Sequence, residues 1–179
     1  TDVVVGLEMP SGANFSLEPG GQIEFSSRPQ NSLRKISEDT IEAFTLLETA
    51  GRGEVVFLDH GTNPISPADL PLLIPKHRYK ILDKYFRSEV GGRGVHMMRN
   101  TATIQPNIDV VGDEDWADAT NLTFVLTPFI RHMFANSDYF QGKRSIYTSE
   151  RQAIWEKTDP TRSGIPLSVV FADDVPCAY

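Results

Sequence analysis

The chain has 179 residues, 40% hydrophobic and 23% charged, which is an ordinary composition for one globular domain with a hydrophobic core. A formal net charge of -7, without any cluster of Lys and Arg, argues against a nucleic-acid-binding protein. The single cysteine, Cys177, excludes an internal disulfide framework and favours a reducing compartment such as the cytoplasm, and no apolar run is long enough to span a bilayer.

Two short strands are predicted near the start of the chain, at residues 3–9 and 22–26. The second strand follows a tight turn at residues 19–21 (PGG), and its alternation separates a polar face from an apolar face. Three acids lie on or beside these strands: Glu8, Glu18 and Glu24. Carboxylates on rigid strands suit hard cations such as Mg²⁺, so all three are candidate metal ligands. Simple exposure to water is the alternative, although acids are depleted in strands.

Four helices are predicted further along the chain, together with a strand at residues 55–59 and loops at 51–53 and 63–75. The helices cover residues 37–50, 77–86 and 113–134, and a short fourth helix is capped by Ser149. Ser37 is the expected N-cap of the first helix and Gly51 its end. Ile81, Leu82, Tyr85 and Phe86 are expected in the core, and Pro128 predicts a kink or break in the third helix.

Residues 97–110 (MMRNTATIQPNIDV) alternate between polar and apolar positions, which predicts a strand with two different faces. The polar face carries short or fork-shaped hydrogen-bonding side chains: Arg99, Thr101, Thr103, Gln105, Asn107 and Asp109. Such a face is typical of the lining of a polar ligand cavity. A solvent-washed face of an antiparallel sheet is the alternative.

Five segments resemble, in order, the motifs of the second family of glutamate–cysteine ligases, which includes plant, proteobacterial and actinobacterial enzymes. They are residues 16–26 (SLEPGGQIEFS), 77–82 (HRYKIL), 97–109 (MMRNTATIQPNID), 134–137 (FANS) and 151–155 (RQAIW), the last followed by Asp159, Arg162 and Gly164. One such motif alone would be a weak signal, but five in the family's order across most of the chain are a strong one.

The chain also departs from the family pattern. The Glu-x-Glu of the family's first strand reads Glu8-Met9-Pro10 here, and only residues 10–16 precede the turn motif, where the family has a long segment. The family's C-terminal half is absent. We therefore expect residues 1–179 to be a single, partial catalytic domain from which segments of a longer protein are missing; the alternative is a truncated or deleted relative.

The resemblance implies an α+β fold of the glutamine synthetase-like kind, with a curved antiparallel sheet whose concave polar face holds the substrates and helices on the other face. It implies an enzyme that uses ATP and Mg²⁺ to join the glutamate γ-carboxylate to the cysteine amine through an acyl phosphate, the first step towards glutathione or a related thiol. The implied partners are these small molecules, with neither nucleic acid nor membrane.

Candidate roles follow from that resemblance together with the chemistry of each side chain. Glu8, Glu18 and Glu24 would bind the metal, with Gln105 a weaker, neutral ligand. Arg99 and Arg151 would hold the amino-acid carboxylate or the transferred phosphoryl oxygens, because a guanidinium is a planar, permanently charged fork. The remaining candidates would contact substrates: Thr101, Thr103 and Asn107 by neutral hydrogen bonds, Trp155 as a pocket wall and Arg162 as a loop phosphate contact. The alternatives are ordinary salt bridges for Arg99 and Arg151, core packing for Trp155, and a solvated loop side chain for Arg162.

Two other functions are compatible with the sequence. One is a ligase that joins glutamate, or another carboxylate, to a different amine. The other is a catalytically inactive domain that binds an amino acid or a nucleotide, which the incomplete Glu8-Met9-Pro10 pattern favours. ADP release that depends on Mg²⁺ separates an enzyme from a sensor, and dependence on the added amine separates the two ligases.

Overall fold

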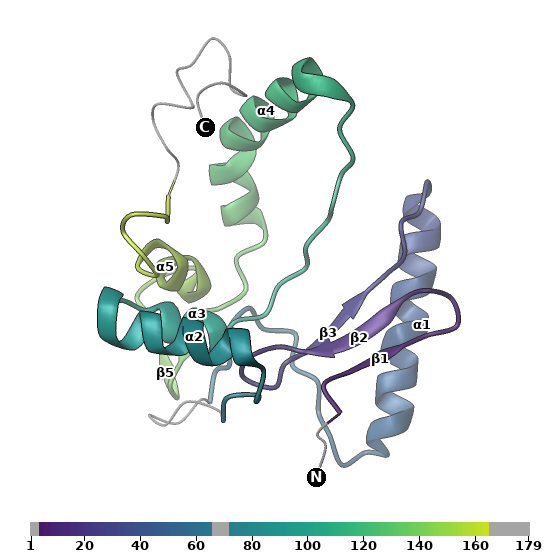
Figure 1. The fold of residues 1–179 in the computed structure, drawn as a ribbon, viewed down its shortest axis with the longest axis horizontal. Helices are drawn as coiled ribbons and strands as arrows, with labels where there is room; N and C mark the ends of the chain where they lie inside the picture. Colours follow the sequence, from purple (N-terminus) through teal and green to yellow (C-terminus); the bar gives the residue numbers. More distant parts are fainter. Residues whose placement is uncertain (1–3, 66–71, 165–179) are drawn as a thin grey trace.

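The computed structural model describes residues 4–65 and 72–164 of the chain, which form a mixed α and β structure (Figure 1). Its N-terminal part is a three-stranded antiparallel sheet in the order β1-β2-β3, formed by β1 (Gly6–Glu8), β2 (Asn14–Leu17) and β3 (Ile23–Ser26). The two strands predicted in this part of the sequence are therefore confirmed, the first in a shorter form. Val3, part of the first predicted strand, lies outside the described residues.

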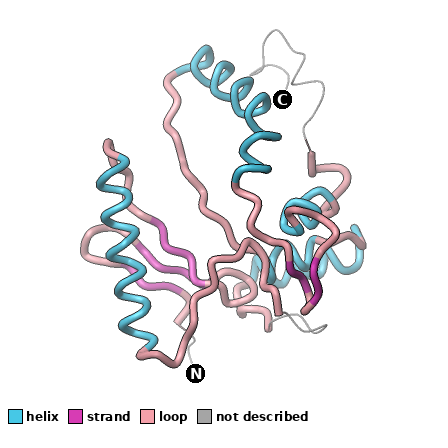
Figure 2. Tube along the Cα trace, turned by 180° about the vertical axis from the view of Figure 1, so that it is seen from behind, coloured by secondary structure: helices cyan, strands magenta, loops and turns pink. Residues whose placement is uncertain are grey.

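The pairing register divides the sheet into an apolar and a polar face. Leu7, Phe15 and Phe25 stand opposite one another on the apolar face, where the two phenylalanine rings have centroids 5.2 Å apart. Side chains alternate along each strand, so Glu8 and Glu24 belong to the opposite, polar face. The helix α1 (Leu33–Gly51) lies across one face of this sheet, behind the strands in Figure 1 and in front of them in Figure 2.

The predicted turn between β2 and β3 is confirmed, and it continues the pairing of the two strands. The backbone N–H of Glu18 donates to the carbonyl oxygen of Gln22 at 2.9 Å, and the N–H of Gly21 donates to the carbonyl of Glu18 at 2.8 Å. Gly21 has φ 85°, in the left-handed region that favours glycine. The turn therefore depends on its own local chemistry.

Close backbone contact holds this turn against the helical part of the protein. Pro19 is buried, and its carbonyl accepts a hydrogen bond from the N–H of Ile74 at 2.9 Å. A Cβ atom at Gly20 would overlap the carbonyl oxygen and Cα of Arg99. Only glycine lets the two backbones approach this closely.

The helical part is built around a small hydrophobic core. Its elements are α2 (His77–Tyr85), the π-helical turn η1 (Phe86–Val90), α3 (Gly94–Asn100) and α5 (Glu150–Glu156). α3 packs against α2, η1 and α5. The buried side chains of the core come from α2, η1 and α3: Tyr79, Phe86, Val95 and Met98.

A long helix, α4 (Gly112–Met133), stands apart from this core, joined to it by extended segments (Figure 1). Acids occupy its first turn, and Arg131 and His132 its last, which complements the helix dipole. Pro128 lies inside α4 and does not end it. A two-stranded hairpin follows, made of β4 (Tyr139–Phe140) and β5 (Lys143–Arg144).

The prediction of a strand at residues 97–110 is wrong. Residues 94–100 form α3, Thr101 makes a single bridge to Thr62, and residues 102–111 are extended but unpaired with any described strand. Met and Arg are good helix formers, and burial of the Met98 side chain in the core stabilises the helix. Pro106 lacks an N–H, so the later part of the segment is a poor ladder partner.

Three smaller predictions are also wrong. Residues 55–59 pair with no described strand, and Val56 is exposed there. α1 begins at Leu33 rather than after Ser37, and the ion pair between Arg34 and Glu38 at 2.9 Å supports its added first turn. Ile81 and Leu82 are exposed rather than in the core, because α2 turns Tyr79 inward instead.

The remaining helices agree with the sequence in position. α2 and α4 cover the predicted residues within a position at either end, and α5 follows Ser149, whose Oγ accepts the N–H of Gln152 at 3.3 Å. No helix among the described residues is long and apolar enough to cross a membrane. Cys177 lies outside the described residues.

The contact at Gly20 predicts an unequal response of the two turn glycines to alanine. Gly20→Ala should lower the free energy of unfolding by about 3 kcal/mol, because the methyl group overlaps backbone that cannot move aside. Gly21→Ala, which meets no atom within 4 Å, should cost only the φ strain of about 1 kcal/mol. Urea unfolding of both variants measures the difference. A smaller loss for Gly20→Ala than for Gly21→Ala would contradict the described contact.

Candidate active site

The acids Glu18 and Glu24 lie on the same face of the sheet, at the end that meets the helices. Glu18 is paired with Gln22 across the turn, so Glu24 is its diagonal neighbour on β3. Diagonal neighbours on one face are about 7–8 Å apart, within reach of two long side chains that bind one ion. Glu8 is on the same face but on β1, in line with Asn14 and Ser26 rather than with Glu24. Two strand spacings of about 4.8 Å each, together with this offset along the strands, put Glu8 farther from Glu24 than Glu18 is. The structure therefore brings two of the three acids together.

The described residues contain no group of three acidic, His or Cys side chains that could hold a metal ion alone. Mg²⁺ in nucleotide sites is usually bound through one or two carboxylates, with substrate phosphates and water completing its shell. Glu18 and Glu24 fit such a shared site better than Glu8, which is separated from Glu24 by β2. Two carboxylates are too few to hold a metal ion in the absence of substrate, so this pair suits an ion that binds together with the nucleotide.

Arg78 and Tyr79, at the start of α2, face this pair of acids. The guanidinium of Arg78 donates to the Tyr79 hydroxyl at 3.0 Å, and that hydroxyl lies 3.3 Å from Oε1 of Glu18. The hydrogen bond to Tyr79 raises the pKa of Arg78, and the negative charges of Glu18 and Glu24 raise it further. Arg78 was not among the site residues predicted from the sequence, although it lies in the 77–82 motif.

The polar residues predicted on one strand face are divided between two environments. Arg99 is only 9% exposed and forms a buried ion pair with Asp83 of α2. Thr101 donates from its hydroxyl to the carbonyl oxygen of Met97 at 2.7 Å, and so closes the last turn of α3. Thr103, Gln105 and Asn107 lie exposed on the extended stretch after α3. Without a strand, the alternation does not place these residues on one surface.

Two serines hold the start of α5 and thereby place Arg151. The hydroxyl oxygen of Ser137 accepts the N–H of Arg151 at 3.0 Å, and its carbonyl oxygen accepts the N–H of Glu150 at 2.9 Å. Ser149 caps the same helix, and the two serine hydroxyls are 3.3 Å apart. The 134–137 motif therefore acts as a helix cap for the 151–155 motif.

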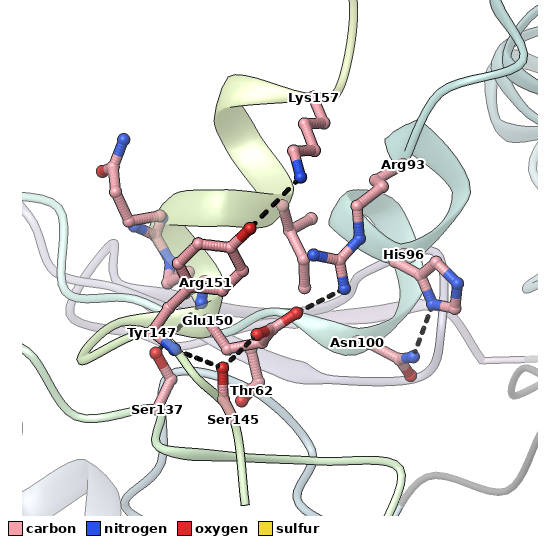
Figure 3. A network of polar contacts seen from close by, with 12 residues as sticks. Thr62, Arg93, His96, Asn100, Ser137, Ser145, Tyr147, Glu150, Arg151 and Lys157 are labelled. Carbon is pink, nitrogen blue, oxygen red and sulfur yellow. Dashed lines mark hydrogen bonds and ion pairs between the residues drawn. The ribbon is translucent and has the colours of Figure 1, made fainter.

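Glu150 is the centre of a polar network beneath α5 (Figure 3). It is 5% exposed, and its carboxylate accepts hydrogen bonds of 2.5 Å from Arg93 and from the Ser145 hydroxyl. His96, on the next turn of α3 after Arg93, lies 3.2 Å from the side-chain amide of Asn100. Burial lowers the pKa of His96, and the charge of Arg93 lowers it further.

Arg151 differs from the buried arginines because its charge has no carboxylate partner among the described residues. Its guanidinium lies 5.5 Å from the centre of the Trp155 ring, and its buried Nε makes no hydrogen bond within the described part of the chain. Burial lowers the pKa of Arg151. A half-buried guanidinium without a carboxylate partner is suited to an anionic ligand.

Arg162 lies in the loop after α5, far more exposed than Arg151. Its Nε is 3.6 Å from Oδ2 of Asp159, and 73% of its side chain is exposed. Asp159 is buried and accepts from Thr161 and from the Tyr85 hydroxyl at 2.8 Å, which ties the loop to α2. The hydrogen bonds from Thr161 hold the pKa of Asp159 below its usual value.

Comparison with known proteins defines the class to which this fold and site belong. The sequence model of the glutamate-cysteine ligase family 2 matches residues 1–175, and the chain belongs to that family. It is 34% identical over 174 residues to a chloroplastic glutamate–cysteine ligase of Solanum lycopersicum, covering 96% of this chain and 32% of that protein.

Two further relatives carry related names. The chain is 35% identical over 172 residues to a chloroplastic glutamate–cysteine ligase A of Oryza sativa subsp. indica, covering 95% of this chain and 34% of that protein. It is 34% identical over 174 residues to a chloroplastic glutamate–cysteine ligase of Arabidopsis thaliana, covering 96% of this chain and 33% of that protein. The chain thus spans about one third of the length of the curated relatives it matches.

The network at Glu150 predicts a large stability loss when its carboxylate is removed. Glu150→Ala leaves the guanidinium of Arg93 without its buried partner and should lower the free energy of unfolding by about 3 kcal/mol. Glu38→Ala, which breaks an exposed pair on α1, is the control and should cost at most about 0.5 kcal/mol. Equal losses in urea unfolding would show that the Arg93–Glu150 pair is no more important than a surface pair.

Proposed function

We propose that this chain is part of an enzyme that joins the γ-carboxylate of glutamate to the amine of cysteine at the expense of ATP. The observation that carries the proposal is the family match together with the pair Glu18 and Glu24 on one sheet face, opposite Arg78. The product would be γ-glutamylcysteine, on the route to glutathione or a related thiol.

The proposed reaction has two steps. An oxygen of the glutamate γ-carboxylate attacks the γ-phosphorus of ATP, so that an acyl phosphate forms and ADP leaves. The amine of cysteine then attacks the acyl carbon, phosphate leaves with the bonding electron pair, and the amine loses a proton. Catalysis of such transfers rests mainly on positioning and electrostatic stabilisation.

Glu18 and Glu24 are the proposed protein ligands of Mg²⁺, which, when bound with ATP, would neutralise charge on the phosphates. Arg78 would balance the two carboxylates and hold the Tyr79 hydroxyl against Glu18. Glu8 and Gln105 remain weaker candidates, because Glu8 is two strands from Glu24 and Gln105 is exposed.

The arginines divide into two proposed roles. Arg151 is the favoured holder of a substrate carboxylate or phosphoryl oxygen, since its half-buried guanidinium lies beside the ring of Trp155 and has no carboxylate partner among the described residues. Arg99 would have an indirect role: its ion pair with Asp83 would hold α2 and α3 in position next to the site. Thr101, Thr103, Asn107 and Arg162 are proposed substrate contacts.

We also propose that the three-stranded sheet is part of a larger, curved antiparallel sheet in the complete protein, of the glutamine synthetase-like kind. The polar face that carries the acids would then be its concave, substrate-holding side. The division of β1–β3 into a polar and an apolar face supports this arrangement. The single cysteine supports a reducing location, proposed to be the cytoplasm, while the names of the relatives above refer to the chloroplast.

A ligase for a different amine is the second candidate function. The acids and Arg78 would be the same in that enzyme, and only the amine pocket would differ. Trp155, which is partly exposed beside Arg151, is compatible with either acceptor.

Detection of the product by mass spectrometry tests the proposed function. The full-length protein, incubated with glutamate, cysteine, ATP and Mg²⁺, should form γ-glutamylcysteine and release ADP in equal amounts. Omission of cysteine is the control and should abolish product. ADP release that requires another amine would identify the second candidate, and a lack of any ADP release that depends on Mg²⁺ would contradict both ligases.

Loss of one acid of the pair should lower turnover strongly without unfolding the protein. Glu24→Gln keeps the size of the exposed side chain but removes its charge, and turnover should fall by about a hundredfold. Glu42→Gln, an exposed change on α1, is the matched control and should leave turnover unchanged. Unchanged turnover in Glu24→Gln would exclude Glu24 from the metal site.

A further inference from the structure

The side chain of Gln22 joins the turn that carries the acids to the end of α3. Its Oε1 accepts the N–H of Gly20 at 2.8 Å, within the turn itself. Its Nε2 donates to two carbonyl oxygens of the other segment, Met98 at 3.2 Å and Thr101 at 3.0 Å. One neutral amide thus connects residues that are 76 and 79 positions apart in sequence.

These contacts satisfy backbone carbonyl oxygens at the C-terminal end of α3. The last carbonyl oxygens of a helix lack intrahelical donors, and Met98 lies in the last turn of α3, with Thr101 directly after it. The amide can face only one way, with its oxygen towards an N–H and its nitrogen towards two carbonyls. A side chain of similar length without an amide cannot replace these bonds.

Gln22 is also directly coupled to both acids. Glu18 is its partner across the turn, through the backbone hydrogen bond of 2.9 Å, and Glu24 follows two residues later on the same face. Any shift of the turn relative to α3 would therefore move both carboxylates together, away from Arg78 and Tyr79 on α2.

We propose that Gln22 is a positioning residue for the metal–nucleotide site: its amide fixes Glu18 and Glu24 relative to the end of α3 without touching substrate or metal. The inference rests on the proposed function, because in that function Glu18 and Glu24 bind the Mg²⁺ that accompanies the nucleotide. Loss of the amide should weaken metal binding, since groups that orient metal ligands typically account for a factor of 10–100 in affinity.

Binding of Mn²⁺, followed by electron paramagnetic resonance in the presence of ADP, tests the proposal on the full-length protein. Gln22→Met has an unbranched, neutral side chain of similar size and should weaken Mn²⁺ binding by about tenfold. It should also raise the Mg²⁺ concentration needed for half-maximal turnover by a similar factor, with little change in kcat at saturating Mg²⁺. Gln22→Met is chosen over Gln22→Glu because a new carboxylate would itself attract the ion.

Gln141→Met, an exposed change in the turn between β4 and β5, is the matched control and should leave Mn²⁺ binding unchanged. Gln22→Asn, which is one methylene too short to bridge both segments, should also weaken binding, and it serves if Gln22→Met does not fold. Each variant is measured below its own melting temperature, so that lost stability is not mistaken for lost affinity.

The outcomes separate this proposal from the one on which it rests. Wild-type affinity for Mn²⁺ in a folded Gln22 variant, with or without a lower melting temperature, would overturn the positioning role alone. Failure of the wild-type protein to bind Mn²⁺ with ADP and to form product would overturn the proposed function as well. Weaker binding in both Gln22 variants, with the control unchanged, is the expected result.

Discussion

The close approach of the β2–β3 turn to the end of α3 is the constraint on which the rest of the site depends. At Gly20 the two backbones are too near for any side chain, and the carbonyl of Pro19 is bonded to the segment that leads into α2. Lys76 adds a hydrogen bond from its Nζ to the carbonyl of Leu17 at 2.9 Å. The sheet is thereby fixed to α2 and α3 at one end, and that end carries Glu18 and Glu24.

A second set of backbone contacts brings the remaining motifs to the same helices. Thr62 is 2% exposed and bridges to Thr101, while the N–H of Gly61 donates to the carbonyl of Asn136 at 2.7 Å. Residues 61 and 62 therefore lie between the end of α3 and the segment before Ser137, which in turn leads to the start of α5. Motifs separated by many residues become neighbours through short, irregular segments rather than through a continuous sheet.

The arginines show how the surroundings of a charge decide its use. Arg93 forms an ion pair with Glu150, and Arg99 forms one with Asp83. Both pairs stabilise the packing of α3 against its neighbours. Breaking such pairs is costly because it leaves an uncompensated charge in a poorly solvated place. Arg78 instead lies close to two acids, next to Tyr79. Arg151 is half-buried without a carboxylate partner among the described residues, so its charge can be balanced by a ligand.

The sequence by itself determined the features that depend on local chemistry. The Pro-Gly-Gly turn, the cap at Ser149, the positions of α2 and α4, and the alternating faces at residues 22–26 all follow from neighbouring residues, and the ordered motifs identified the family. Only the tertiary structure decided that residues 94–100 are helical, that Arg99 pairs with Asp83, and that Arg78 and Gln22 join the acids. An alternating pattern becomes a strand only where a partner can satisfy its backbone, and a side chain meets its partner only after distant segments have packed. Neither condition can be read from a short stretch of sequence. The residues that surround Glu18 and Glu24 therefore could not be predicted from the spacing of residues along the chain.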